Sequence, residues 1–287
     1  MTLTFERADA DTFVPDGTEL GAALARTTHL GVGAHQDDLE LMAVHGILEC
    51  FQAPERWFTG VVVSDGRGSP RAAGPEALSD SELAATRRLE QRKAAALGEY
   101  AAQLQLGFPS RSAKSKVAAE RAEVVLDLTR ILRATRPEVV YTHNLADKHD
   151  THVAVTLRLL EACQSLPAEE RPRRVIGCEV WRDLDWLVDA DKVALDASAR
   201  EDLAKQLLEA FDSQVSGGKR YDLATLGRRA ANATFHTSHA TDAAKAITWA
   251  MDLTPLVADE KLSVQEFTLA YVDRLRADIA ARLKRFL

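Results

Sequence analysis

The chain has 287 residues, of which 46% are hydrophobic and 28% charged, so it is long enough to bury a core without disulfide bonds. Its net charge of −7 argues against a general nucleic-acid-binding protein, which would present a basic surface to phosphates. Three isolated cysteines and the lack of an apolar leader or of any run of about 18 apolar residues predict a cytoplasmic protein without a membrane span.

The N-terminal half alternates segments typical of buried strands with segments that have the spacing of amphipathic helices. In chain order, the expected strands lie at 28–34, 57–64, 100–106 and 137–142. The expected helices lie at 39–51, 79–97, 116–134 and 153–163. This order predicts a Rossmann-like α/β fold, in which a mostly parallel sheet carries helices on both faces.

The C-terminal half is less regular. It contains one further expected strand, at 174–181, and three expected helices, at 199–211, 221–231 and 267–286. No repeat or linker separates the two halves. We therefore expect one domain over residues 1–287, with a core at about 28–182 and a C-terminal elaboration at about 183–287.

Two polar clusters directly follow expected strands. The first contains His35, Asp37 and Asp38, and the second runs over residues 143–152. Open parallel sheets bind ligands beyond the carboxyl ends of their strands, so both clusters lie where a ligand site is expected. Four of the eight histidines of the chain occur in these clusters: His35, His143, His149 and His152.

The residue types in the two clusters suit a metal ion. Zinc accepts histidine nitrogen and carboxylate oxygen, and a catalytic zinc needs three protein ligands and one open position. His35, Asp38 and His152 would supply such a set, and iron(II) could occupy the same ligands. A structural zinc site would need a fourth protein ligand.

The same clusters contain groups suited to amide hydrolysis. A zinc ion polarises the carbonyl, and a carboxylate next to a ligand, here Asp37, would take a proton from the attacking water. His149 would stabilise the oxyanion or protonate the leaving amine, with Asp147 and Asp150 favouring its charged form. Two simpler interpretations stay open, because an Asp-Asp pair is also typical of a helix N-cap and an isolated HxxH is a weak metal signal.

The two clusters resemble the motifs of the LmbE/PIG-L family of zinc-dependent N-deacetylases. AHQDDL at 34–39 is similar to AHPDDE, and HDTH at 149–152 is similar to HPDH. Gln36, Leu39 and Thr151 depart from these motifs, where the family has proline, glutamate and aspartate. The resemblance spans 28–163. It implies that His35, Asp38 and His152 bind zinc and that Asp37 is the general base. It also implies that His149 stabilises the oxyanion or protonates the leaving amine.

Weaker similarities extend the expected site. The loop Ser64-Asp65-Gly66 resembles a glycine-bearing loop of the substrate pocket, and Arg87 with Glu90 resembles an arginine-glutamate helix. An exposed salt bridge explains the pair of Arg87 and Glu90 equally well. We expect Trp181 to form an aromatic wall of the pocket, and ordinary core packing is the alternative. The expected substrate contacts are Asp65, Gly66, Arg87, His143, Asp147 and Trp181.

The resemblance implies removal of an acetyl group from a small N-acetylglucosamine conjugate, for example N-acetylglucosaminyl-malate. An amidase of a thiol conjugate and a chitooligosaccharide deacetylase are alternatives within the same chemistry. A non-catalytic sugar- or nucleotide-binding module is an alternative of another class, and it predicts no bound metal. The expected partner is a small amino-sugar substrate rather than nucleic acid, and a homo-oligomer is compatible with the sequence.

Overall fold

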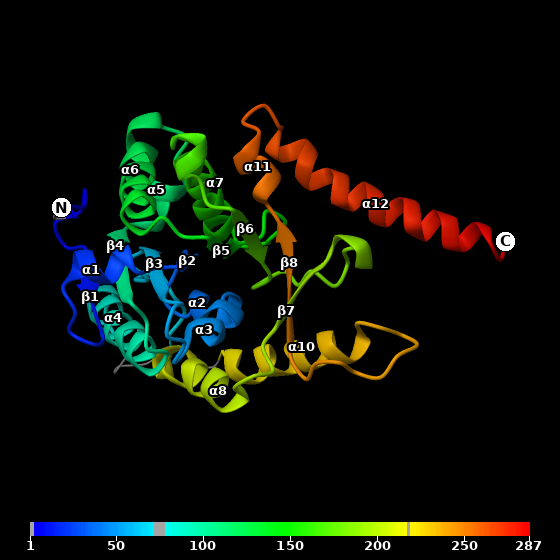
Figure 1. Ribbon diagram of the computed structural model, residues 1–287, viewed down its shortest axis with the longest axis horizontal. Coiled ribbons are helices and arrows are strands. Elements are labelled where there is room, and N and C mark those ends of the chain that lie inside the picture. Colours follow the sequence, from blue (N-terminus) through cyan, green and yellow to red (C-terminus); the bar gives the residue numbers. More distant parts are fainter. Residues whose placement is uncertain (1–2, 72–77, 217–218) are drawn as a thin grey trace.

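The computed structural model describes residues 3–71, 78–216 and 219–287 (Figure 1). Its centre is an eight-stranded sheet with the order β1-β4-β3-β2-β5-β6-β8-β7. The strands are β1 (Asp11–Phe13), β2 (His29–Gly33), β3 (Phe58–Ser64), β4 (Ala102–Phe108), β5 (Val139–His143), β6 (Arg174–Cys178), β7 (Val193–Asp196) and β8 (Ile247–Asp252).

The five strands from β4 to β6 pair in parallel, whereas β1 and β8 join the sheet antiparallel to β4 and β6, and β7 pairs antiparallel with β8. This arrangement confirms the predicted α/β fold with a mostly parallel sheet. The antiparallel strands β7 and β8 extend the sheet from the C-terminal half and were not predicted.

Helices cover both faces of the sheet (Figure 1). On one face α1, α5, α6, α7 and α11 contact one another, and on the other α2, α3, α4, α8, α9 and α10 do so, while α12 extends away from the sheet. Among the described residues, no helix is both long and apolar enough to cross a membrane. The helices are α1 (Leu20–Ala25), α2 (Asp38–Met42), α3 (Val44–Cys50), α4 (Asp80–Leu97), α5 (Ser110–Lys114), α6 (Ala118–Thr135), α7 (Asp150–Gln164), α8 (Glu201–Glu209), α9 (Asp212–Val215), α10 (Tyr221–Phe235), α11 (Thr254–Ala258) and α12 (Val264–Lys284).

Each face of the sheet packs its own hydrophobic cluster. Val32, Leu128 and Leu159 belong to the cluster under α6 and α7, whereas Leu39 and Ile47 belong to the cluster under α2 and α3. Because the central strands are buried on both faces, they are nearly continuous runs of apolar residues, which is why the sequence predicts them well.

The prediction of one continuous helix over 39–51 is wrong. The segment forms two helices, α2 and α3, which meet at Ala43 with φ −103° and ψ 16°. Arg229 from α10 donates through Nη2 to the backbone carbonyls of Glu40 and Leu41, at 2.8 and 3.0 Å. A buried guanidinium thus satisfies carbonyls at the end of the first helix, where the regular pattern stops.

Gly46 in α3 and Gly227 in α10 give a matched test of packing. A Cβ on Gly46 would lie 2.5 Å from the buried Tyr141 ring, whereas a Cβ on Gly227 would have no atom within 4 Å. We expect Gly46→Ala to lower the free energy of unfolding by about 1–3 kcal/mol through overpacking. Gly227→Ala should raise it by about 0.5–1 kcal/mol through helix propensity. Urea unfolding measures both, and equal stabilisation by the two variants would contradict the packing of α3 on β5.

Candidate active site

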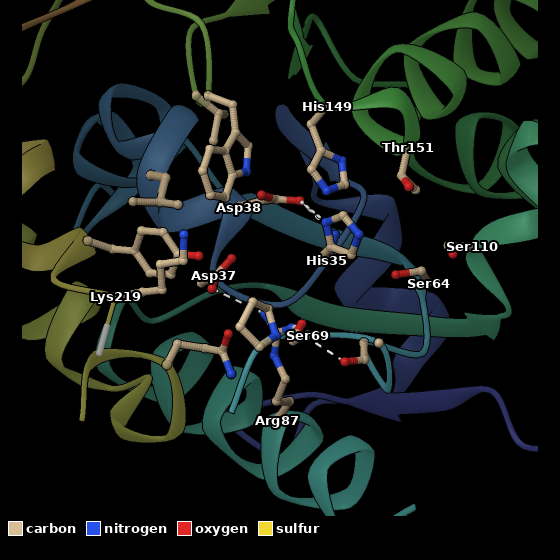
Figure 2. A pocket seen from close by; sticks show the side chains of 18 of the residues that line it. His35, Asp37, Asp38, Ser64, Ser69, Arg87, Ser110, His149, Thr151 and Lys219 are labelled. Atoms are coloured by element: carbon tan, nitrogen blue, oxygen red, sulfur yellow. Dashed lines mark hydrogen bonds and ion pairs between the residues drawn. The ribbon is translucent and has the colours of Figure 1, made fainter. Parts of the chain in front are cut away.

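A cavity of about 790 Å³ opens at the carboxyl ends of the parallel strands. Its walls come mainly from the segments that follow the five parallel strands β2, β3, β4, β5 and β6, and from α10. His35, Asp37, Asp38 and His149 all line this cavity, and Figure 2 shows their side chains around one hollow. The two clusters, more than 100 positions apart in the sequence, therefore share one site.

Asp38 lies between the histidines of both clusters. Its Oδ2 is 3.2 Å from Nδ1 of His35, and its Oδ1 is 3.4 Å from Nε2 of His152. Although burial alone would raise the pKa of Asp38, the histidines around it, His152 first, hold that pKa well below its usual range. An ionised, acceptor-rich carboxylate beside imidazole nitrogens is what a divalent cation requires.

His152 is held in one orientation by a second carboxylate. Its Nδ1 lies 3.2 Å from Oδ2 of Asp147, while its Nε2 is buried and has no hydrogen-bond partner among the described residues. Burial lowers the pKa of His152 to about 4, so the imidazole is neutral at neutral pH. Nε2 therefore carries a lone pair directed at Asp38 and fits the role of a metal ligand.

Asp147 lies behind the pocket rather than in its wall. Besides His152, it accepts hydrogen bonds from the backbone N–H groups of His149, Trp181 and Arg182, at 3.1 to 3.3 Å. The hydrogen bond with His152 holds the pKa of Asp147 below its usual value, although burial opposes this. The structure thus places Asp147 where it orients His152 and joins the segments after β5 and β6.

His143 is also buried behind the pocket. Its Nε2 accepts a hydrogen bond from the backbone N–H of Ala34 at 2.9 Å, and its ring stacks on His152 with centroids 3.8 Å apart. Among the described residues, two overlapping groups have ligand atoms close enough to hold an ion, and both contain His152: His35, His149 and His152, and Asp38, His143 and His152. Because the Ala34 hydrogen bond already uses Nε2 of His143, the atoms best placed for a metal belong to His35, Asp38, His149 and His152.

Asp37 adopts a left-handed backbone conformation, with φ 81°. Aspartate tolerates this region better than most residues do. The carboxylate is largely buried at the pocket floor, where Arg87 donates to it at 3.1 Å. Burial raises the pKa of Asp37 to about 7, because the desolvation cost exceeds the stabilisation by Arg87. Asp37 occupies the N-cap position of α2, but its side chain makes no capping hydrogen bond, so helix capping does not account for this carboxylate.

Arg87 is buried, with 1% of its surface exposed. It donates to Asp37, to the backbone carbonyl of Gln36 and to the hydroxyl of Ser69, and so joins the segments after β2 and β3. Glu90 instead accepts hydrogen bonds from Ser213. The alternative of an exposed Arg87–Glu90 salt bridge is therefore wrong, because the partner of Arg87 is the carboxylate of Asp37.

The departures from the family motifs have clear places in the fold. Gln36 donates to Gln105 at 3.1 Å and lies under the turn at Gly66, where φ is 69° and a Cβ would collide with the Gln36 amide.

Leu39 is in the core. Glu40 does not line the pocket and accepts hydrogen bonds from Gln91 and Tyr100, while burial raises its pKa to about 8. Gln91 in turn accepts from the backbone N–H of Asp37 and so braces it.

The C-terminal half completes the pocket. Trp181 lines it and lies close to His149, with ring centroids 6.1 Å apart, so its surroundings are those of a pocket wall rather than of a closed core. Asp65 and Gly66 line it as well. Four lining residues that sequence reasoning missed recur with helical spacing on one face of α10: Tyr221, Thr225, Arg228 and Arg229. That spacing inside an expected helix was the available signal.

Comparison with known proteins gives one family match and several similar folds. Residues 30–163 match the PIG-L family model, described as GlcNAc-PI de-N-acetylase, and no curated protein matches the chain in sequence. The hydratase GalB of Pseudomonas putida KT2440, which acts on 4-carboxy-2-hydroxymuconate, is 17% identical with a TM-score of 0.62, covering 79% of this chain and 96% of its own.

Deacetylases are also among the similar structures. The N,N'-diacetylchitobiose deacetylase of Pyrococcus horikoshii is 17% identical with a TM-score of 0.61, covering 83% of this chain and 88% of its own. A deacetylase of the teicoplanin biosynthesis pathway is 15% identical with a TM-score of 0.53, covering 78% and 97%.

Identities this low show a shared fold, and a hydratase is among these structures, so the fold alone does not select the reaction. The family match is more specific, because residues 30–163 include both polar clusters and the strands that position them. Residues 30–163 therefore belong to the PIG-L family of deacetylases, and the histidine and aspartate side chains of this segment form a site suited to a metal ion.

Proposed function

We propose that this deacetylase removes the acetyl group from an N-acetylglucosamine conjugate, with a zinc ion held by His35, Asp38 and His152. The observation that carries the proposal is the buried Nε2 of His152, which Asp147 orients and which has no hydrogen-bond partner within the described part of the chain. A similar fold described as a diacetylchitobiose deacetylase supports an acetylated amino sugar as the substrate class.

When bound, the metal would supply a Lewis acid that polarises the acetyl carbonyl and acidifies water. Asp37 then accepts a proton from the attacking water, since its raised pKa is close to neutrality and Arg87 fixes its carboxylate. His149 faces the same cavity, 5.0 Å from His35 between ring centroids. It hydrogen-bonds the developing oxyanion or gives a proton to the leaving amine.

The sugar itself needs a surface that combines apolar faces with polar groups. Trp181 and Tyr221 contact each other edge to face, with ring centroids 5.9 Å apart, and both line the pocket, as does the loop of Asp65 and Gly66. An aromatic ring packs against the C–H face of a pyranose, and the loop offers a carboxylate and backbone groups to its hydroxyls. This arrangement favours a sugar over an extended apolar acyl chain.

The proposal is tested by metal analysis of the purified protein and by acetate release from a panel of N-acetylglucosamine conjugates. We expect about one zinc or iron(II) ion per chain and release of free acetate. Both metals are measured because one similar structure is described as a zinc-inhibited form of teicoplanin deacetylase. Release of a larger acid would identify an amidase, and preference for chitooligosaccharides would identify that substrate class. Absence of both metal and turnover would favour a binding module.

A further inference from the structure

The pocket is much more basic than the chain as a whole. Lysine and arginine outnumber aspartate and glutamate nine to four among the residues that line it. The entire chain, by contrast, has a formal net charge of −7. Such a local reversal of charge concentrates anions at the site, because a low-dielectric cleft focuses the field of the charges in its walls.

Four of these nine basic residues lie on α10 or directly before it. Lys219, Arg220, Arg228 and Arg229 all line the pocket, and we call these four residues with Tyr221 and Thr225 the α10 wall. Figure 2 shows Lys219 on the side of the pocket opposite Thr151. The wall lies outside residues 30–163, the segment that matches the family model.

The innermost cation of the α10 wall has unused donors. Arg229 is 2% exposed, and only its Nη2 is engaged, by the carbonyls at the end of α2. Its Nε and Nη1, like the hydroxyl of the neighbouring lining residue Thr248, have no hydrogen-bond partner among the described residues. Buried N–H groups without partners are costly, and an anionic ligand group would satisfy them.

Nearby carboxylates do not cancel the charge of the wall. Asp222 pairs with Arg220 at 2.8 Å. Glu179 lines the pocket and acts electrostatically on Arg228 and Arg229, and its two oxygens accept hydrogen bonds from Asn232 and from the backbone N–H groups of Leu184 and Trp249. Glu179 alone cannot neutralise the three cations Lys219, Arg228 and Arg229, and the lining as a whole keeps an excess of positive charge.

We propose that the α10 wall binds a carboxylate or phosphate on the part of the substrate that remains attached to the amine. This inference rests on the proposed function, because it assumes that the acetamide lies at His35 and Asp38. Arg229 provides the buried donors, and Arg228 and Lys219 provide charge nearer the opening. The substrate class becomes an anionic conjugate of N-acetylglucosamine rather than a neutral oligosaccharide.

Three glycosides of N-acetylglucosamine test the proposal, with a methyl, a carboxymethyl or a phosphoethyl aglycone. For the metal-loaded protein we expect kcat/KM at least tenfold higher for one anionic glycoside than for the methyl glycoside, and the preferred anion distinguishes carboxylate from phosphate. The preference should fall as salt is added, because part of the attraction is screened.

Arg228→Gln and Lys219→Gln should each remove about tenfold of kcat/KM for the anionic glycoside, mainly through KM, and change the methyl glycoside less than twofold. Arg276→Gln on the exposed face of α12 removes the same charge outside the pocket and should change neither substrate. Equal rates for all three glycosides, or equal losses on both substrate types, would overturn the anion site while leaving deacetylation intact. No acetate from any glycoside would instead count against the proposed function.

Discussion

The Asp37→Asn variant should bind metal at the normal stoichiometry and lose about two to four orders of magnitude in kcat, the usual contribution of a general base. The substitution keeps the shape of the side chain and an oxygen that accepts from Arg87, but the amide cannot take a proton. A large fall in kcat with little change in metal content therefore separates proton transfer from metal binding. Acetate release and elemental analysis of the same preparation measure the two effects.

Asp127→Asn is the matched control for Asp37→Asn. Asp127 is also a buried carboxylate that accepts from an arginine, Arg130, but it lies on α6 outside the pocket. We expect normal turnover from this variant, and a thermal melt of both variants checks that they are folded. Near-normal turnover of Asp37→Asn would mean that another group accepts the proton.

His152→Ala should abolish stoichiometric metal binding, because it removes the imidazole whose free Nε2 lies against Asp38. Asp147→Asn keeps that imidazole but removes the charge behind it, so metal affinity should fall about 10–100-fold. Competition with a chelator measures the affinities, and circular dichroism of the metal-free proteins separates loss of a ligand from unfolding.

His45→Gln is the control for this series. His45 is half-buried and hydrogen-bonds Tyr141 at 2.9 Å, outside the pocket, so its removal should leave metal binding unchanged. Full metal occupancy of His152→Ala would show that His35, Asp38 and His149 hold the ion without it. An unchanged affinity in Asp147→Asn would mean that Asp147 only joins the segments after β5 and β6.

The residues that could be predicted from the sequence directly follow buried parallel strands. β2 and β5 are short runs of apolar residues that end at the two polar clusters, so the topology rule was enough to bring His35 and His149 together. Arg87 shows the limit of this reasoning. The helix that contains Arg87 can be predicted from the spacing of its residues. The burial of Arg87 cannot be predicted in this way, because it depends on a contact with Asp37, 50 positions earlier in the chain.

The shortest strands were harder to predict because they carry little periodic signal. β7 has four residues and β1 three, too few for an alternation to be recognised. The break at Ala43 was missed because the apolar spacing continues across it, and the group that satisfies the freed carbonyls, Arg229, is almost 190 positions away. Long-range contacts of this kind determine which residues form the walls of the pocket, but the local sequence does not indicate them.

The pocket is assembled from two stretches of the chain that can change separately. The candidate ligands and Asp37 precede residue 163, while Trp181 and α10 follow it. Substitutions on one helical face can thus reverse the polarity of the cavity without moving a ligand of the metal. Chains that keep the same hydrolytic motifs are free to diverge in the compounds they accept, and redesign of specificity in this scaffold should begin at α10.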